Sequence, residues 1–104
     1  MKKLYIVKYA RDFEKIINKG TCSKNKSFVV YSLNNDLAYD RYGISVSNKL
    51  GNAVFRNKYK RKIRSIIDNY KKNYIKGKDY IIILRKGALE ESFQDLSKEL
   101  TSLM

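Results

Sequence analysis

Several residue types are absent or scarce in this 104-residue chain, and each absence excludes a class of site. There is no histidine and only one cysteine, Cys22, so a zinc site with the usual ligands and an internal disulfide are both excluded. Without a histidine to activate its thiol, Cys22 is interpreted as a small, partly buried residue rather than a nucleophile. We therefore predict no metal and no cofactor bound by the protein alone.

Long apolar runs are absent as well. The longest, Tyr80–Leu84, is far shorter than the ~20 apolar residues that span a bilayer. The N-terminal segment also lacks the apolar stretch of a signal peptide. These absences favour a cytoplasmic protein that makes no membrane contact.

Acidic residues are few, and they are not arranged for catalysis. The chain has 10 Asp and Glu against 23 Lys and Arg, which gives a formal net charge of +13. Asp36 and Asp40 flank a loop, Glu90 and Glu91 begin a helix, and no glycine spacing fits a phosphate-binding loop. We predict no catalytic side chain, and binding to nucleic acid or another anionic surface.

The residues that are present are typical of a globular protein. The chain is 43% hydrophobic and contains nine tyrosines and four phenylalanines, enough for one small core. No proline, repeat or low-complexity linker divides it. A single domain over residues 1–104 is therefore predicted.

The positive charge is concentrated in one stretch, Gly51–Arg64, and no acidic residue lies between Asp40 and Asp68. Half of the arginines fall in this stretch although lysine is commoner overall, which indicates a need for planar, bidentate donors. The alternative is a solvated charged face, but such faces usually mix glutamate with lysine. A phosphate-rich partner is the better interpretation.

A helix is predicted over this stretch, with Asn52 as its cap and Gly77 after its end at Tyr74 or Lys76. At about 100° per residue, its apolar residues form one stripe that must face a core. The stripe contains Phe55, Tyr59, Ile63, Ile66, Ile67, Tyr70 and Tyr74. The neighbouring flank, here called the basic row, contains Arg56, Asn57, Lys60, Arg61 and Arg64. Lys58 and Lys62 lie on the other flank of the stripe.

Hydrophobic periodicity predicts further elements on both sides of this helix. They are a helix over 11–19, strands over 27–33, 41–47 and 78–84, and a last helix over 90–103. Residues 1–9 are interpreted as an extended or poorly ordered lead-in, and 24–26 as a turn. The order α-β-β-(β)-α-β-α, with the bracketed strand optional, predicts an α+β fold with a single mixed sheet and helices packed on it.

One face of this sheet has room for a ligand. Val29 and Tyr31 face the same way, and the strand over 41–47 places its small polar residues, including Ser45, opposite its large apolar ones. Phe13 and Ile17 share a face of the first helix and could form one wall of a groove, with the basic row as the other wall. The ordinary alternatives are a solvated sheet face and a helix pair packed in the core.

The residues described so far resemble the bacterial ribonuclease P protein subunit. The hallmark of that family is a loop that leads into an Arg-Asn-Arg helix, and it stands here as SVSNKLGNAVFRNKYKRKIR, Ser45–Arg64. The resemblance extends to RDF at Arg11–Phe13, FVVYSL at Phe28–Leu33 and DYIIILRK at Asp79–Lys86. It therefore covers most of the chain.

The resemblance implies a role without catalysis by the protein itself. In that family a catalytic RNA cleaves with magnesium ions, and the protein docks on this RNA and grips the 5′ leader of precursor tRNA, with no protein partner required. By position, the RNA-contacting residues correspond to Arg56, Asn57, Lys58, Lys60, Arg61 and Arg64. The leader-binding cleft corresponds to Phe13, Ile17, Val29, Tyr31 and Ser45. The resemblance also implies a left-handed strand–helix–strand crossover, a sense that is rare in proteins.

Three residues depart from the family pattern. Lys58 replaces the second arginine of Arg-Asn-Arg, which keeps the charge and loses the planar fork. Ile17 stands where an aromatic residue is common, and Gly87 replaces a usual proline. The competing interpretation is a stand-alone basic RNA-binding protein, of the ribosomal kind, without a processing role.

Overall fold

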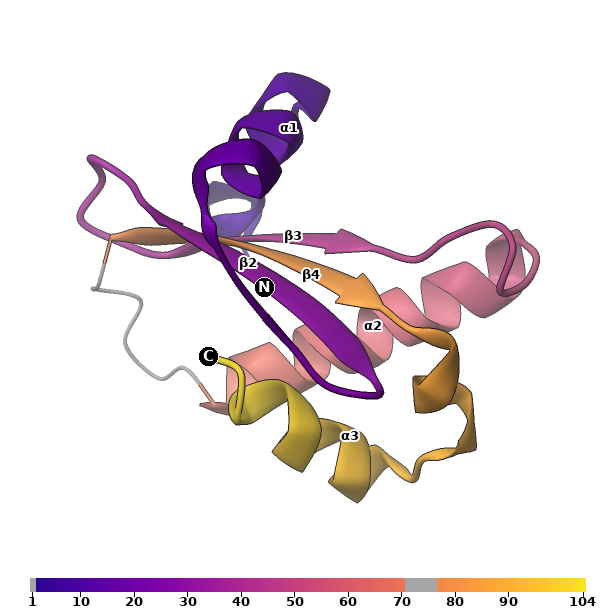
Figure 1. The fold of residues 1–104 in the computed structure, drawn as a ribbon. Helices are drawn as coiled ribbons and strands as arrows, with labels where there is room; N and C mark the ends of the chain where they lie inside the picture. The colour runs from indigo at the N-terminus through magenta and orange to yellow at the C-terminus, as the bar shows by residue number, and fades with distance from the viewer. Residues whose placement is uncertain (1, 71–76) are drawn as a thin grey trace.

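The computed structural model describes residues 2–70 and 77–104, and its elements follow the predicted order (Figure 1). The helices are η1 (Lys3–Tyr5) and η2 (Lys86–Glu90), both 3-10, and α1 (Ala10–Lys19), α2 (Ala53–Tyr70) and α3 (Phe93–Thr101). The strands are β1 (Thr21–Lys24), β2 (Phe28–Asn34), β3 (Arg41–Ser45) and β4 (Lys78–Leu84). Within the described residues, no helix is long and apolar enough to cross a membrane.

The four strands form one mixed sheet in the order β1-β2-β4-β3. β2 runs antiparallel to both β1 and β4, whereas β3 runs parallel to β4. β4 therefore has a neighbour on each side and helices on both faces, which explains why its sequence is a continuous apolar run. The predicted α+β fold and the central position of this strand are confirmed.

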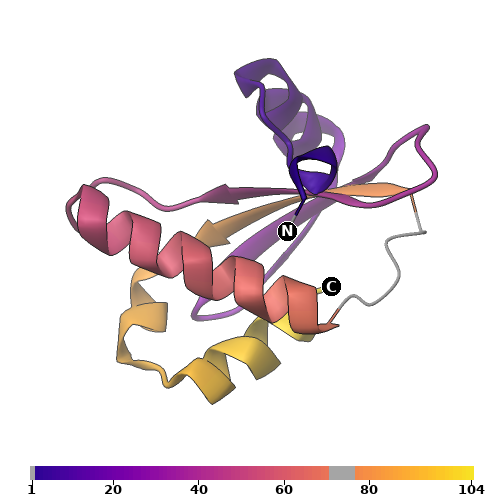
Figure 2. The same cartoon turned by 180° about the vertical axis from the view of Figure 1, so that it is seen from behind.

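α1 lies on one face of the sheet, and α2 and α3 lie on the other (Figures 1 and 2). Both faces can be covered because successive side chains along each strand point to opposite faces. On one face, Phe28 and Val30 belong to the main core with residues of α2 and α3. On the other face, Ile81 packs with Ile16 of α1 and with Val7 in a second, smaller cluster. Both faces of the sheet thus carry a hydrophobic layer, and α1 covers only part of its face.

The connection from β3 through α2 to β4 has the unusual hand. When α2 faces the viewer, as in Figure 2, and the two parallel strands are turned to point upward, β4 lies to the left of β3. This is a left-handed crossover, whereas almost all such connections are right-handed. The expectation drawn from the family resemblance is confirmed.

The structure differs from several local predictions. The lead-in, interpreted as extended or poorly ordered, is ordered: it contains η1, its extended residue Ile6 pairs with Tyr42 at the edge of the sheet, and Val7 is buried. Residue 24, predicted within a turn, ends strand β1, where Lys24 pairs with Val29. The last helix begins later than predicted, because the Ser92 side chain caps it by accepting from the backbone N–H of residue 95 at 3.2 Å.

Polar side chains fix the start of β4 against β3. Arg41 forks onto Asp79, with Nε to Oδ1 at 2.8 Å and Nη2 to Oδ2 at 2.6 Å. Asn35 also donates to Asp79 Oδ1 at 2.7 Å. Burial of the Asp79 carboxyl disfavours its charged form, but the hydrogen bonds from Arg41 and Asn35 outweigh this and lower its pKa below the ordinary 3.8.

Candidate RNA-binding surface

The basic helix begins where the sequence predicts. The Asn52 side chain accepts from the backbone N–H of Phe55 at 3.0 Å, so it caps α2. Four members of the apolar stripe are buried in the main core: Tyr59, Ile63, Ile66 and Ile67. Tyr70, also assigned to the stripe, is 45% exposed, because it stands at the end of the described helix rather than over the core. Tyr74 lies outside the described residues.

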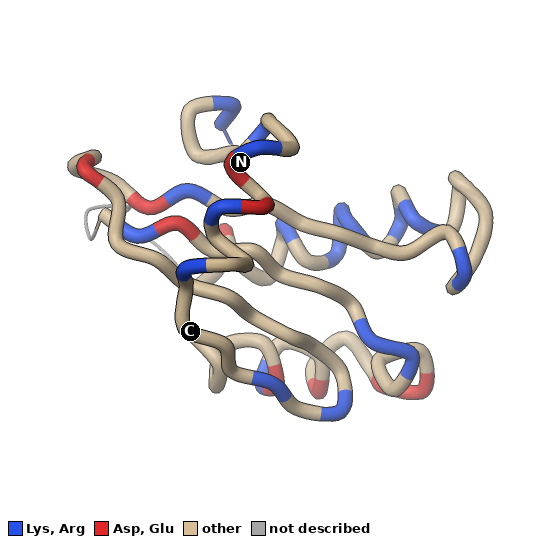
Figure 3. Tube along the Cα trace, turned by 45° about the horizontal axis from the view of Figure 1, so that its top comes forward, with Lys and Arg blue, Asp and Glu red and all other residues tan. Residues whose placement is uncertain are grey.

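The basic row lies along one flank of this packed stripe. Asn57 and Arg61 are exposed, and Arg56, Lys60 and Arg64 are half-buried, as expected of residues next to the stripe. Within residues 2–70 and 77–104, none of the four cations forms an ion pair. Figure 3 shows Lys and Arg repeated along α2 and acidic residues on α3. The positive charge of the row is therefore not neutralised within the described chain.

The two flanks of the apolar stripe differ in the surroundings of their cations. The Arg56 Nε is buried and has no hydrogen-bond partner in the described residues. Lys62, on the opposite flank, places its Nζ 4.7 Å from the centre of the Tyr59 ring in a cation–π contact. Lys58 is exposed. Arg56 and Lys62, predicted to lie on different flanks, therefore have different environments.

The α1 side of the sheet presents two successive rows of residues. In the first row, Tyr31, Ile81 and Gly43 are register partners and lie under α1. The Phe13 ring packs closely on Gly43: a Cβ added to Gly43 would stand 2.6 Å from Cζ of Phe13. Ile17 packs against the same cluster, together with Tyr31. The structure therefore brings Phe13, Ile17 and Tyr31 together.

The second row, here called the open row, consists of Val29, Ile83 and Ser45, which are register partners across β2, β4 and β3. All three are half-buried. Lys24, the partner of Val29 on β1, extends the row to the sheet edge and is exposed. Val29 and Ser45, both predicted cleft residues, thus flank Ile83, which sequence reasoning assigned only to a central strand.

One part of the predicted groove is wrong. The basic row was expected to form the wall opposite Phe13 and Ile17, but α2 packs on the other face of the sheet. The open row and the basic row are therefore two surfaces on different layers. Among the described residues, no group of three or more His, Cys, Asp or Glu is placed to hold a metal ion.

Comparison with known proteins identifies the family. The family model named Ribonuclease P matches residues 1–104, the whole chain. The chain belongs to the ribonuclease P protein family. The ribonuclease P protein component of Streptococcus pneumoniae (strain Hungary19A-6) is 43% identical over 104 residues, which cover 100% of this chain and 85% of that protein.

Solved structures of ribonuclease P proteins share this fold. The ribonuclease P protein of Staphylococcus aureus matches with a TM-score of 0.86 and 41% identity over 95% of this chain and 91% of that one. The protein from Thermotoga maritima matches with a TM-score of 0.85 and 35% identity over 93% of this chain and 92% of that one. The chain is thus a ribonuclease P protein component, an RNA-binding subunit of an endoribonuclease in tRNA processing. No finding favours a stand-alone RNA-binding protein.

Proposed function

We propose that this chain docks on the catalytic RNA of ribonuclease P through the N-terminal half of α2 and holds the 5′ leader of precursor tRNA on the α1 side of its sheet. The observation that carries the proposal is the presence of two separate RNA-compatible surfaces on opposite layers of one small sheet. Two surfaces allow one protein to touch two RNAs at once. Removal of the leader then leaves the mature 5′ end of the tRNA.

The basic row suits the docking role. Arg56, Arg61 and Arg64 can each offer a planar fork to phosphate oxygens, and Lys60 adds a point charge between them. Asn57 and Lys58, both exposed, complete the set of proposed RNA contacts. Because no carboxylate of the described chain pairs with these cations, binding to RNA breaks no existing ion pair.

The α1 side of the sheet suits the leader role. Tyr31 and Phe13 supply aromatic surface, on which unpaired bases stack with little sequence preference. The open row is partly apolar, with Ser45 at one end. Ile17, placed where an aromatic residue is common in the family, offers apolar contact in place of stacking. We infer that Phe13, Ile17, Val29, Tyr31 and Ser45 contact the leader.

We assign the hydrolytic chemistry to the RNA subunit with its magnesium ions and no catalytic side chain to this protein. The protein contributes by neutralising phosphates where two RNAs meet, which otherwise requires more metal ions. It needs no protein partner for this role, and it works in the cytoplasm, where precursor tRNA is made.

Cleavage at low magnesium tests the proposal. A ribonuclease P RNA is incubated with precursor tRNA at a magnesium concentration too low for cleavage by the RNA alone, with and without the protein. We expect the protein to restore cleavage at the mature 5′ end, and the Arg61→Gln/Arg64→Gln variant to restore much less. The exposed α3 variant Lys98→Gln should behave like the wild type. Absence of any stimulation, or cleavage by the RNA-free protein, would contradict the assigned roles.

A further inference from the structure

A hollow of about 220 Å³ lies at the end of the sheet where α1 stops and β1 and β4 begin. It is lined by Lys19, Thr21, Ser32, Leu33, Asn34 and Lys78, and is here called the end pocket. Its volume is several times the roughly 30 Å³ that one water molecule occupies in the liquid. The pocket can therefore hold a small polyatomic ligand.

The lining of the end pocket is rich in hydrogen-bond donors. Five of its six side chains can donate: two ammonium groups, two hydroxyls and one amide. No carboxylate is among its described lining residues. Within the described chain, none of these five side chains forms a hydrogen bond or an ion pair with another residue. Donors that line one pocket without protein acceptors are suited to an anion.

The carboxylates associated with Lys78 are already occupied. Asp79, its neighbour in sequence, is held by Arg41 in the fork described above. Asp40 accepts a hydrogen bond from the backbone N–H of Lys78 at 2.8 Å and is fully buried. Neither is among the residues that line the end pocket. The Lys78 ammonium group remains available to a ligand.

The backbone frame of the pocket is preformed. α1 ends at Gly20, directly against β2. Only glycine fits at this position, because a Cβ would clash with the carbonyl oxygens of Ile16 and Ser32. Thr21 and Ser32 are register partners on neighbouring strands, so their side chains stand on the same face of the sheet. The hydroxyls therefore need no loop rearrangement to meet a ligand.

We propose that the end pocket binds a phosphate group, and that this phosphate belongs to an RNA backbone. A phosphate accepts several hydrogen bonds from differently placed donors, and lysine binds it as a point charge. The pocket is formed by the end of α1 and one end of the sheet, where strand register places Thr21, Ser32, Asn34 and Lys78 on the face that α2 covers. No residue of the basic row is among its described lining residues. The phosphate source rests on the proposed function, but phosphate binding by the pocket does not.

The first experiment uses the protein alone and inorganic phosphate as the probe. Phosphate is titrated at constant ionic strength, and backbone amide chemical shifts are followed by NMR. We expect a saturable shift of Gly20, Thr21, Ser32 and Asn34. The variant Lys19→Gln/Lys78→Gln should bind about tenfold more weakly, because two charge-assisted contacts are lost.

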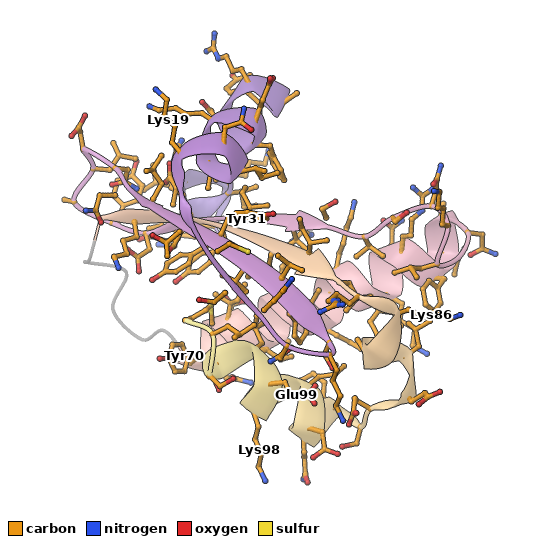
Figure 4. All side chains as sticks on the ribbon, in the orientation of Figure 1. Lys19, Tyr31, Tyr70, Lys86, Lys98 and Glu99 are labelled. Atoms are coloured by element: carbon orange, nitrogen blue, oxygen red, sulfur yellow. The ribbon has the colours of Figure 1, made fainter. Side chains whose placement is uncertain are left out.

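The control variant is Lys3→Gln/Lys98→Gln, which removes the same charge from exposed positions outside the pocket. Figure 4 shows Lys98 on α3 and Lys19 at the end of α1, on opposite sides of the sheet. This variant should bind phosphate as the wild type does. Equal weakening in both variants, or shifts confined to the first turns of α2, would overturn the site.

The second experiment identifies the source of the phosphate. Affinity for ribonuclease P RNA is measured against salt concentration for the wild type and Lys19→Gln/Lys78→Gln. If the pocket holds a backbone phosphate, the slope of log affinity against log salt should fall by about 0.7 to 0.9. An unchanged slope together with lost phosphate binding would overturn the RNA source and leave a site for free phosphate. If Lys19→Gln/Lys78→Gln keeps both its phosphate binding and the wild-type slope, the proposal is overturned, whatever the outcome of the cleavage assay.

Discussion

Tyr31 lies at the border between the packed and the open parts of the α1 side of the sheet. It is half-buried against the cluster of Val7, Ile16 and Ile81, and its row adjoins the open row. A ring in this position can pack with one edge and still offer surface to an unpaired base. Its role in packing must therefore be separated from its role in binding.

Truncation of Tyr31 should weaken leader binding selectively. Because stacking of one base on an aromatic ring is worth roughly 1 to 3 kcal/mol, Tyr31→Ala should weaken binding of precursor tRNA with several leader nucleotides by about that amount. Binding of mature tRNA should barely change. The measurement is the affinity of the reconstituted ribonucleoprotein for both RNAs. Tyr31→Phe keeps the ring and should keep most of the discrimination, whereas equal losses for both RNAs would remove Tyr31 from the cleft.

The arginines of the basic row should matter more for RNA affinity than Lys62. Arg61 and Arg64 form no ion pair in the described chain, whereas the ammonium group of Lys62 already lies over the Tyr59 ring. We expect Arg61→Ala or Arg64→Ala to cost about 1 to 2 kcal/mol more RNA-binding free energy than Lys62→Ala, because a charge-assisted fork is lost. Filter binding to ribonuclease P RNA at fixed salt measures this. Equal, small losses at all three sites would indicate only diffuse charge.

The sequence predicts some residues of the α1 side of the sheet, and only the folded structure reveals the others. Tyr31 and Val29 were placed on one face by strand alternation, which fixes side-chain direction without knowledge of the neighbours. Ile83 could not be recognised as part of the open row, because a continuous apolar strand does not reveal which residues are covered. Gly43 alternates with large apolar residues along β3, and only the packed structure shows that it makes room for the Phe13 ring.

At the scale of elements, strong periodicity was a reliable guide and short segments were not. α2 begins at its predicted cap, and β4 spans its predicted residues, because each has a long apolar pattern. β1 was missed because its four residues, TCSK, are all exposed and have no apolar alternation. Its strand conformation depends on pairing with β2, which is a tertiary effect.

The junction of β3 and β4 gives stability a defined pH dependence. The folded-state pKa of Asp79 lies below its ordinary 3.8, so the stabilisation from its charged form is present above that pH. It is lost as the pH falls through the lower, folded-state pKa. The Arg41–Asp79 pair should therefore contribute fully near neutral pH and not at all in strong acid.

A double-mutant cycle measures this contribution. Unfolding free energies are determined in urea for the wild type, Arg41→Gln, Asp79→Asn and the double variant across the acid range. The coupling free energy between the two sites should be constant above about pH 5 and vanish below the folded-state pKa of Asp79. A coupling that does not change with pH would show that charge on Asp79 contributes little to holding β3 against β4.

At the scale of the whole molecule, the assignment of helices to faces decides how two RNAs could be held. Alternation along the strand over 41–47 predicts one apolar face and an opposite small, polar face, but it does not predict which helix covers which face. The groove expected between α1 and the basic row assumed that both helices lie on one side. Their placement on opposite sides separates the leader surface from the docking surface by the thickness of the sheet.

The high net charge should make RNA binding strongly dependent on salt, and the dependence should come from a defined surface. If five or six cations of the protein contact phosphates, the log affinity for ribonuclease P RNA should fall with log salt at a slope of roughly 4 to 5. Arg61→Gln/Arg64→Gln should lower this slope by roughly 1.5, since two counterion-releasing contacts are lost. Lys98→Gln, at an exposed position of α3, should leave the slope unchanged.

A charge-preserving variant separates charge from geometry in the same measurement. Arg61→Lys/Arg64→Lys keeps both charges and loses both planar forks, so its slope should match that of the wild type while its affinity is lower at every salt concentration. A slope near one for the wild type would contradict docking through the basic row. Equal reductions for the arginine variant and for Lys98→Gln would show that net charge, rather than the row on α2, drives the association.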